Sequence, residues 1–191
     1  MLTKAFIISL VNNHEATVAT RLLIESIDKT KSELEPIILP ATIPDTIEKD
    51  LAAIGYAKTK WTYPVNPEQD GLDMKTGLKL THYPTAKIGN RVACMVSHMR
   101  CWQKAIDLDE TIIVLEHDAM FTRQFKFSDL TKDFKGGIVG LNNPIGATRR
   151  ANLFDEQVRK NFGLQNVPTV DDSVVPQGLA GNSAYVITPK G

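Results

Sequence analysis

A short apolar run that ends in charged residues lies within residues 111–121, TIIVLEHDAMF. The aliphatic residues Ile112–Leu115 predict a strand that is buried on both faces of a sheet. The strand is followed by Glu116, His117 and Asp118. Because side chains alternate along an extended chain, we expect Glu116 and Asp118 to point to one side, where their carboxylates could share a hard cation. Acidic residues after a strand also serve as helix N-caps or solvated loop residues, and that alternative stays open here.

The length and composition restrict the class of protein. A chain of 191 residues fits one domain with a sizeable core. Lys plus Arg and Asp plus Glu each total 22, which argues against nucleic-acid binding through a concentrated basic surface. The 2 cysteines indicate a reducing compartment. No apolar segment reaches the ~20 residues of a membrane span, and no signal-peptide cleavage site follows the N-terminal apolar run. We therefore expect a cytoplasmic protein without an integral membrane segment.

The order of the predicted elements indicates an α/β fold. Strands are predicted from short apolar runs at Lys4–Val11, Glu35–Leu39, Ile112–Leu115, Gly137–Leu141 and Ser183–Thr188. Helices are predicted from 3.6-residue periodicity or capping signals at His14–Asp28, Pro44–Ile54, Ile88–Leu108, Ser128–Phe134 and Asn152–Phe162. The strand–helix–strand–helix opening is typical of a doubly wound sheet. A long irregular loop is predicted at Lys58–Lys87, which contains several Pro and aromatic residues. The aromatic residues favour an ordered loop that covers another part of the protein.

The helix at Ile88–Leu108 presents two adjacent stripes. The apolar stripe predicted to face the core comprises Ile88, Val92, Met95, Val96, Met99, Trp102 and Ile106. Beside it lie Arg91, Cys94, His98 and Cys101, so we expect His98 at the border between core and solvent. Cys94, His98 and Cys101 could be three metal ligands. A structural zinc site needs a fourth ligand, however, so two thiols packed at the edge of the core are the favoured interpretation.

Three blocks of the chain together resemble glycosyltransferase family 25, the lipooligosaccharide galactosyltransferase-like group. The helix IGNRVACMVSHMRCWQKAI matches the family through Gly89, Cys94, Ser97, His98 and Trp102. The run TIIVLEHDAMF is similar to the family's apolar strand followed by E-D-D-A-x-F. The segment GNSAYVITPKG, residues 181–191, is similar to G-x-x-A-Y-x-I-x-x-x-G. The resemblance covers nearly the whole chain, and the blocks occur in the family's order.

The resemblance implies a single GT-A-like domain over residues 1–191, a Rossmann-like nucleotide-binding mixed sheet flanked by helices. It implies a metal-dependent glycosyltransferase that moves a sugar, of galactose type, from a UDP-sugar to a saccharide or glycolipid acceptor such as lipooligosaccharide. Glu116 and Asp118 would be the catalytic pair and would bind Mn²⁺ or Mg²⁺. The nucleotide sugar would contact Asn12, Arg91, Ser97 and His98. Association with a lipid-linked acceptor would be peripheral, at the inner membrane, and the oligomeric state is left open.

Two departures from the family pattern favour alternatives. The family's central Asp is replaced by His117, and imidazole suits transition metals better than magnesium. The chain also ends at Gly191, where the family continues, so we expect a minimal or C-terminally truncated member. An inverting transfer needs a further carboxylate as base, and Asp171 and Asp172 are candidates by position. Both departures favour a catalytically inactive GT-A-like domain that binds nucleotide or glycan. A third interpretation is an α/β interaction domain without a nucleotide site.

Overall fold

The computed structural model describes residues 2–58, 66–72, 74, 79–80, 82, 87–131, 134, 136–142, 155–156, 159–160, 163–166 and 182–191. The chain divides into two compact units, which we call the sheet unit (Met1–Pro40 with Cys101–Gly191) and the inserted unit (Ala41–Arg100). The division falls within one long helix, α3 (Ile88–Leu108). The single domain expected from the sequence stays a prediction.

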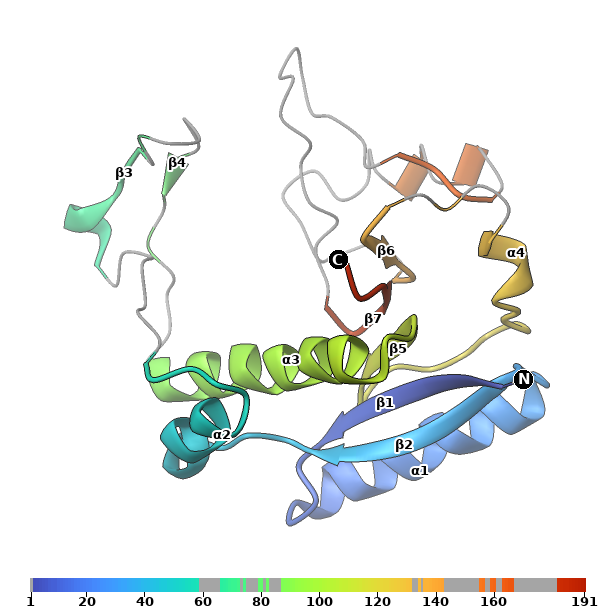
Figure 1. The fold of residues 1–191 in the computed structure, drawn as a ribbon, viewed down its shortest axis with the longest axis horizontal. Coiled ribbons are helices and arrows are strands. Elements are labelled where there is room, and N and C mark those ends of the chain that lie inside the picture. Colours follow the sequence, from blue (N-terminus) through green and yellow to red (C-terminus); the bar gives the residue numbers. More distant parts are fainter. Residues whose placement is uncertain are drawn as a thin grey trace. The chain divides into compact units, whose positions relative to one another are not determined.

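The sheet unit contains a five-stranded mixed sheet in the order β2-β1-β5-β7-β6 (Figure 1). The strands are β1 (Thr3–Ser9), β2 (Leu34–Pro40), β5 (Ile112–Glu116), β6 (Ile138–Gly140) and β7 (Ala184–Ile187). β1 pairs in parallel with both β2 and β5, whereas β7 is antiparallel to β5 and to β6. The expectation of a mixed α/β sheet is confirmed, and each predicted strand is present within two residues of its expected ends.

One face of the sheet packs against α1 (His14–Lys29), which lies along β1 and β2 (Figure 1). Asn13 begins this helix, because its side-chain Oδ1 accepts a hydrogen bond from the Ala16 backbone N–H at 2.9 Å. The alternating residues of the strands and the apolar stripe of the helix form one core: Ala5, Ile7, Leu23, Ile27, Leu34, Ile113, Leu115 and Val186. Burial of these side chains fixes the register of the strands.

The opposite face of the sheet is equally apolar. Its buried side chains are those that alternate with the first core, namely Phe6, Ile8, Ile112, Val114, Tyr185 and Ile187. Within the sheet unit, the C-terminal part of α3 contacts this face, since Trp102 Nε1 donates a 2.8 Å hydrogen bond to Tyr185 Oη. A sheet covered on both faces explains why β5 reads as a continuous apolar run rather than an alternating one.

The buried face of α3 differs from the predicted one. Ala93, Ser97, Cys101 and Ala105, spaced by four residues, are each 3% exposed or less. Of the residues that we expected in the core, Val96 is 0% exposed, whereas Trp102 and Ile106 are 39% and 55% exposed. Residues four apart form one row along a helix, and a row of small side chains allows close packing against the helix, so Trp102 and Ile106 lie at the side of the contact.

The inserted unit contains short helices and one short antiparallel pair of strands. It contains η1 (Pro44–Thr46) with α2 (Ile47–Ala53), η2 (Pro67–Gln69), the antiparallel pair β3 (Gly71–Leu72) and β4 (Lys79–Leu80), and α3 up to Arg100. Asp50 of α2 accepts hydrogen bonds from Thr42 Oγ1 at 2.6 Å and from Arg100 at 3.4 Å, which ties α2 to α3. The aromatic residues of the predicted loop, Trp61, Tyr63 and Tyr83, lie outside the described residues.

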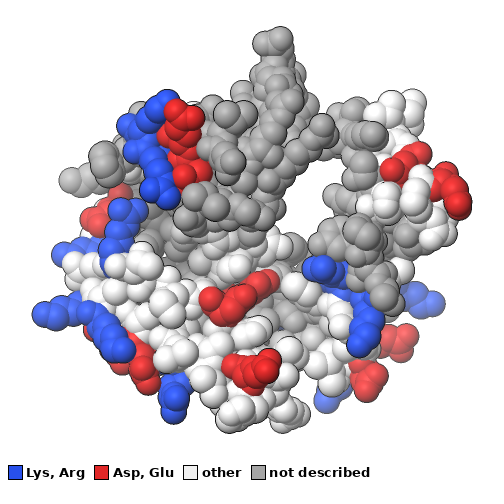
Figure 2. Space-filling view, turned by 180° about the vertical axis from the view of Figure 1, so that it is seen from behind, with Lys and Arg blue, Asp and Glu red and all other residues white. Residues whose placement is uncertain are grey.

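The remaining elements are short. α4 (Ser128–Thr131) is shorter than the helix expected at Ser128–Phe134, and most of the helix expected at Asn152–Phe162 lies outside the described residues. Among the helices that the structure describes, none has the length and apolar character needed to cross a membrane. Basic and acidic side chains lie side by side around the rim of the face shown in Figure 2, and further acidic groups lie nearer its centre.

Candidate functional site

The carboxyl ends of β1 and β5 adjoin at a point where the strand order reverses. The chain proceeds from β1 through α1 to β2 on one side, and β5 then pairs on the other side of β1. Ile8 is opposite Glu116 in the register, and His117 N donates a 3.1 Å hydrogen bond to Ile8 O. In open α/β sheets, such a reversal leaves a crevice beyond the carboxyl ends of the strands, where ligands bind.

The acidic motif forms a tight turn at this edge. β5 ends at Glu116, and the Ala119 backbone N–H donates a 3.0 Å hydrogen bond to Glu116 O, so His117 and Asp118 are the central residues of the turn. The alternation that placed Glu116 and Asp118 on one side therefore does not apply, because the chain is no longer extended after Glu116. Glu116 and His117 are half-buried and Asp118 is exposed. A common metal site for the two carboxylates stays a prediction.

The chemistry of the turn fits a divalent cation that is bound together with a diphosphate. Glu116 and Asp118 each supply carboxylate oxygens, which are the ligands preferred by hard cations such as Mg²⁺. Cations in phosphate-transfer sites commonly take one or two protein carboxylates and complete their shell with phosphate oxygens and water. An exposed Asp118 at the end of a buried strand is accessible for that arrangement. His117 would add a ligand that suits Mn²⁺ better than Mg²⁺.

Asn12 lies in the loop between β1 and α1. It is exposed, and the loop around it is held by a 2.8 Å hydrogen bond from Asn13 N to Leu10 O and by the Asn13 cap of α1. A mainly apolar hollow of about 300 Å³ extends from this loop along α1 to β2, on the side of β1 away from β5, and its lining includes Val11, Thr17 and Ile38. The structure thus places Asn12 at the same edge of the sheet as Glu116 and Asp118.

The other candidate residues lie on α3 in the inserted unit. Arg91 is exposed. Ser97 is 1% exposed, and its Oγ donates to Ala93 O and accepts from Thr42 N, both at 2.9 Å. These two bonds satisfy the buried hydroxyl group, so its burial needs no bound ligand to explain it. A role for Ser97 in binding the sugar donor stays a prediction. The expectation that His98 lies at the border of the core is wrong, because this side chain is 3% exposed.

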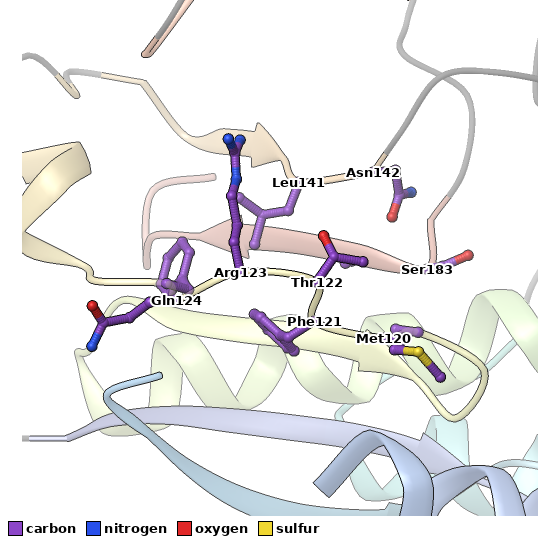
Figure 3. Close-up of a pocket in the computed structure, with 11 residues that line it drawn as sticks. Met120, Phe121, Thr122, Arg123, Gln124, Leu141, Asn142 and Ser183 are labelled. Atoms are coloured by element: carbon purple, nitrogen blue, oxygen red, sulfur yellow. The ribbon is translucent and has the colours of Figure 1, made fainter. Parts of the chain in front are cut away.

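A second feature of this edge was not identified from the sequence. A pocket of about 330 Å³ begins directly after the acidic turn and lies beside the ends of β6 and β7 (Figure 3). Its lining comes from three separate segments: Ala119–Phe125, Leu141–Asn142 and Ser183–Ala184. In the sequence, only the polar turn at Asn142 indicated this region. Ser183 precedes β7, and it reaches the carboxyl edge of the other strands because β7 is antiparallel to β5 and β6, a direction that the sequence pattern does not indicate. The candidate bases Asp171 and Asp172 lie outside the described residues.

Comparison with known proteins gives one match. The model of glycosyltransferase family 25 (LPS biosynthesis protein) matches residues 3–191, which include all three blocks that carry the resemblance. No curated protein and no solved structure matches the chain. The match confirms the family that the sequence blocks indicate, and it covers both the acidic turn and the pocket beside it.

Proposed function

Because the chain belongs to glycosyltransferase family 25, we propose that it is a metal-dependent glycosyltransferase that uses a UDP-sugar. The family is one of glycosyltransferases in lipopolysaccharide biosynthesis. The finer proposal is that a sugar of galactose type moves to a saccharide acceptor such as lipooligosaccharide or another surface glycan. The donor would bind a GT-A-like fold, at the carboxyl edge of the sheet.

One observation carries this proposal: Glu116 ends β5 where β5 adjoins β1 at the reversal of the strand order. A nucleotide diphosphate placed in this crevice would meet the acidic turn on one side and the Asn12 loop on the other. This arrangement supports a nucleotide-sugar site more strongly than the E-x-D pattern does alone.

The chemistry of the transfer explains why carboxylates are needed there. As the glycosidic bond to the donor breaks, negative charge grows on the departing diphosphate. A bound divalent cation would offset that charge as a Lewis acid. Glu116 and Asp118 would hold the cation in place. Transfer with inversion also requires a base for the acceptor hydroxyl, and the proposal leaves that role with Asp171 or Asp172.

Calorimetric titration of UDP tests this proposal. We expect wild-type protein to bind UDP with Mn²⁺ and to lose most of that affinity with a chelator. Asp118→Asn and Glu116→Gln, which keep the shape of the side chain, should each weaken Mn²⁺-dependent binding by about tenfold or more. Asp28→Asn, at an exposed carboxylate in the last turn of α1, is the matched control and should bind like wild type. If the UDP affinity is the same with and without Mn²⁺ and is unchanged by both substitutions, the proposal is contradicted.

His117 favours a second candidate, an inactive domain of the same fold that binds nucleotide or glycan. It stands where the family carries an aspartate, so the turn has one carboxylate fewer than expected. This alternative predicts Mn²⁺-dependent UDP binding without release of UDP from a UDP-sugar. His117→Asp restores the family residue, and a gain of UDP release in that variant alone would favour the alternative over the enzyme.

A further inference from the structure

We propose that the pocket beside the acidic turn binds the saccharide acceptor, an inference that rests on the proposed sugar transfer. The pocket has a volume of about 330 Å³ and is lined by Ala119–Phe125, Leu141, Asn142, Ser183 and Ala184. This volume is at the lower end of small-molecule sites, which span roughly 300–1,000 Å³, and suits a sugar residue better than a whole nucleotide sugar.

The position of the pocket relative to β5 is the first reason. The crevice for the donor lies between β5 and β1, whereas the pocket lies on the β7 and β6 side of β5. Hydrogen bonds hold this side together, from Glu116 N to Ser183 O at 2.8 Å and from Leu141 N to Ala184 O at 2.9 Å. The acidic turn therefore stands between the two sites. The reacting atoms of two substrates must approach to ~3–3.5 Å, and sites that flank one short turn are neighbours, as this approach requires.

The chemistry of the lining is the second reason. Among the described residues that form the pocket, Arg123 is the one charged side chain and no carboxylate is present. The described lining therefore offers a divalent cation no carboxylate ligand. Thr122, Asn142 and Ser183 carry hydroxyl and amide groups that both donate and accept hydrogen bonds, as sugar hydroxyls require. Figure 3 shows Asn142 and Ser183 together with Met120 at one end of the pocket, and Gln124 at the other, with Arg123 between them.

The wall of the pocket is fixed before any ligand binds. Within residues 119–125, the backbone N–H of Phe121 donates to Ser26 Oγ and that of Phe125 donates to Ser32 Oγ, both at 3.0 Å. The two phenyl rings stack edge to face with centroids 6.3 Å apart. These contacts join the segment to the end of α1 and the turn that follows it. A wall held in this way loses little conformational entropy on binding, which favours affinity for a small, polar ligand.

Methyl NMR of protein labelled at the methionine methyl groups tests the inference. Met120 lies in the pocket and is 64% exposed, and Met74 of the inserted unit, 91% exposed, is an internal control. The Met120 signal is assigned from its loss in Met120→Leu. The probes are deacylated core oligosaccharides prepared from several lipopolysaccharides. We expect a saturable shift of the Met120 signal with at least one of them and no shift of Met74.

Substitutions in the lining refine the test. Asn142→Ala and Arg123→Ala should each weaken the saccharide affinity about fivefold, the effect of losing one hydrogen bond. Arg123 is exposed, so its substitution leaves the fold intact even where Asn142→Ala does not. Lys104→Ala, at an exposed cation on α3, should leave the affinity unchanged. Neither lining substitution should alter UDP affinity in the calorimetric titration.

The outcomes separate this inference from the proposed function. If UDP binds with Mn²⁺ but none of the oligosaccharides shifts Met120, the acceptor pocket is refuted and the donor site remains. If UDP alone gives the saturable shift of Met120, the pocket belongs to the donor and the inference is also refuted. If UDP does not bind while an oligosaccharide shifts Met120, the proposed transfer fails, and the pocket is supported as a saccharide site.

Discussion

A buried pair of hydroxyl groups holds the end of β1 against α1, next to the Asn12 loop. Ser9 Oγ and Thr20 Oγ1 are 2.7 Å apart, and the two residues are 2% and 4% exposed. Thr20 Oγ1 also donates to Ala16 O at 2.8 Å. Because a hydroxyl group has a single hydrogen, Thr20 must accept from Ser9 while it donates to Ala16.

This assignment predicts unequal costs for the two single substitutions. Thr20→Val keeps the shape of the side chain but leaves the buried Ser9 hydroxyl without its acceptor, at a cost of about 1–3 kcal/mol. Ser9→Ala leaves Thr20 bonded to Ala16 and should cost about 0.5–1.5 kcal/mol. In the double variant neither hydroxyl remains, so we expect it to be more stable than Thr20→Val alone, a favourable coupling between the two substitutions.

Urea and thermal unfolding, followed by circular dichroism, measure these differences. For a chain of this length, each kcal/mol corresponds to about 2–4 °C in Tm. Thr17→Val makes the same exchange at an exposed position of α1, and we expect it to cost less than about 0.5 kcal/mol. A double variant less stable than Thr20→Val, or a Ser9→Ala variant more damaging than Thr20→Val, would refute the assigned direction of the bond.

Further predictions concern other single contacts. Asn13→Ala removes the cap of α1 and should lower the free energy of unfolding by about 1 kcal/mol, measured by urea denaturation. Ser97→Ala leaves the buried backbone N–H of Thr42 without its acceptor and should cost about 1–3 kcal/mol in the same assay; unchanged stability would contradict the structural role of this hydroxyl. Tyr185→Phe removes the acceptor of Trp102 Nε1, but Trp102 is 39% exposed and water can replace the bond, so we expect a change in tryptophan fluorescence with a loss below about 1 kcal/mol.

The regular elements were largely predictable because local pattern determines them. The helix predicted at Ile88–Leu108 has those bounds in the structure, and the strand at Ile112–Leu115 extends by one residue, to Glu116. Apolar periodicity and capping residues act within a few residues of one another, so the sequence contains them directly. The family, too, was identified from short blocks and then confirmed by the match over residues 3–191.

The conformation of the acidic motif was predicted incorrectly. Alternation would continue past Glu116 only if the chain stayed extended, and the hydrogen bond from Ala119 N to Glu116 O turns it instead. The burial of His98 was also not predicted. Hydropathy favours the large apolar residues of α3 as its buried face, whereas the most buried row of the helix consists of small residues. Whether a polar side chain is buried depends on how closely the elements pack, and the sequence of a single helix does not predict that packing.

The sequence by itself determined the elements, the α/β class and the family, because each depends on residues near one another in the chain. Only the tertiary structure decided the strand order β2-β1-β5-β7-β6 and the antiparallel direction of β7. Those two facts bring the Asn12 loop, the acidic turn, Asn142 and Ser183 to one edge of the sheet. Strand order is set by packing between segments more than 60 residues apart, such as β5 and β7, and no local pattern specifies it.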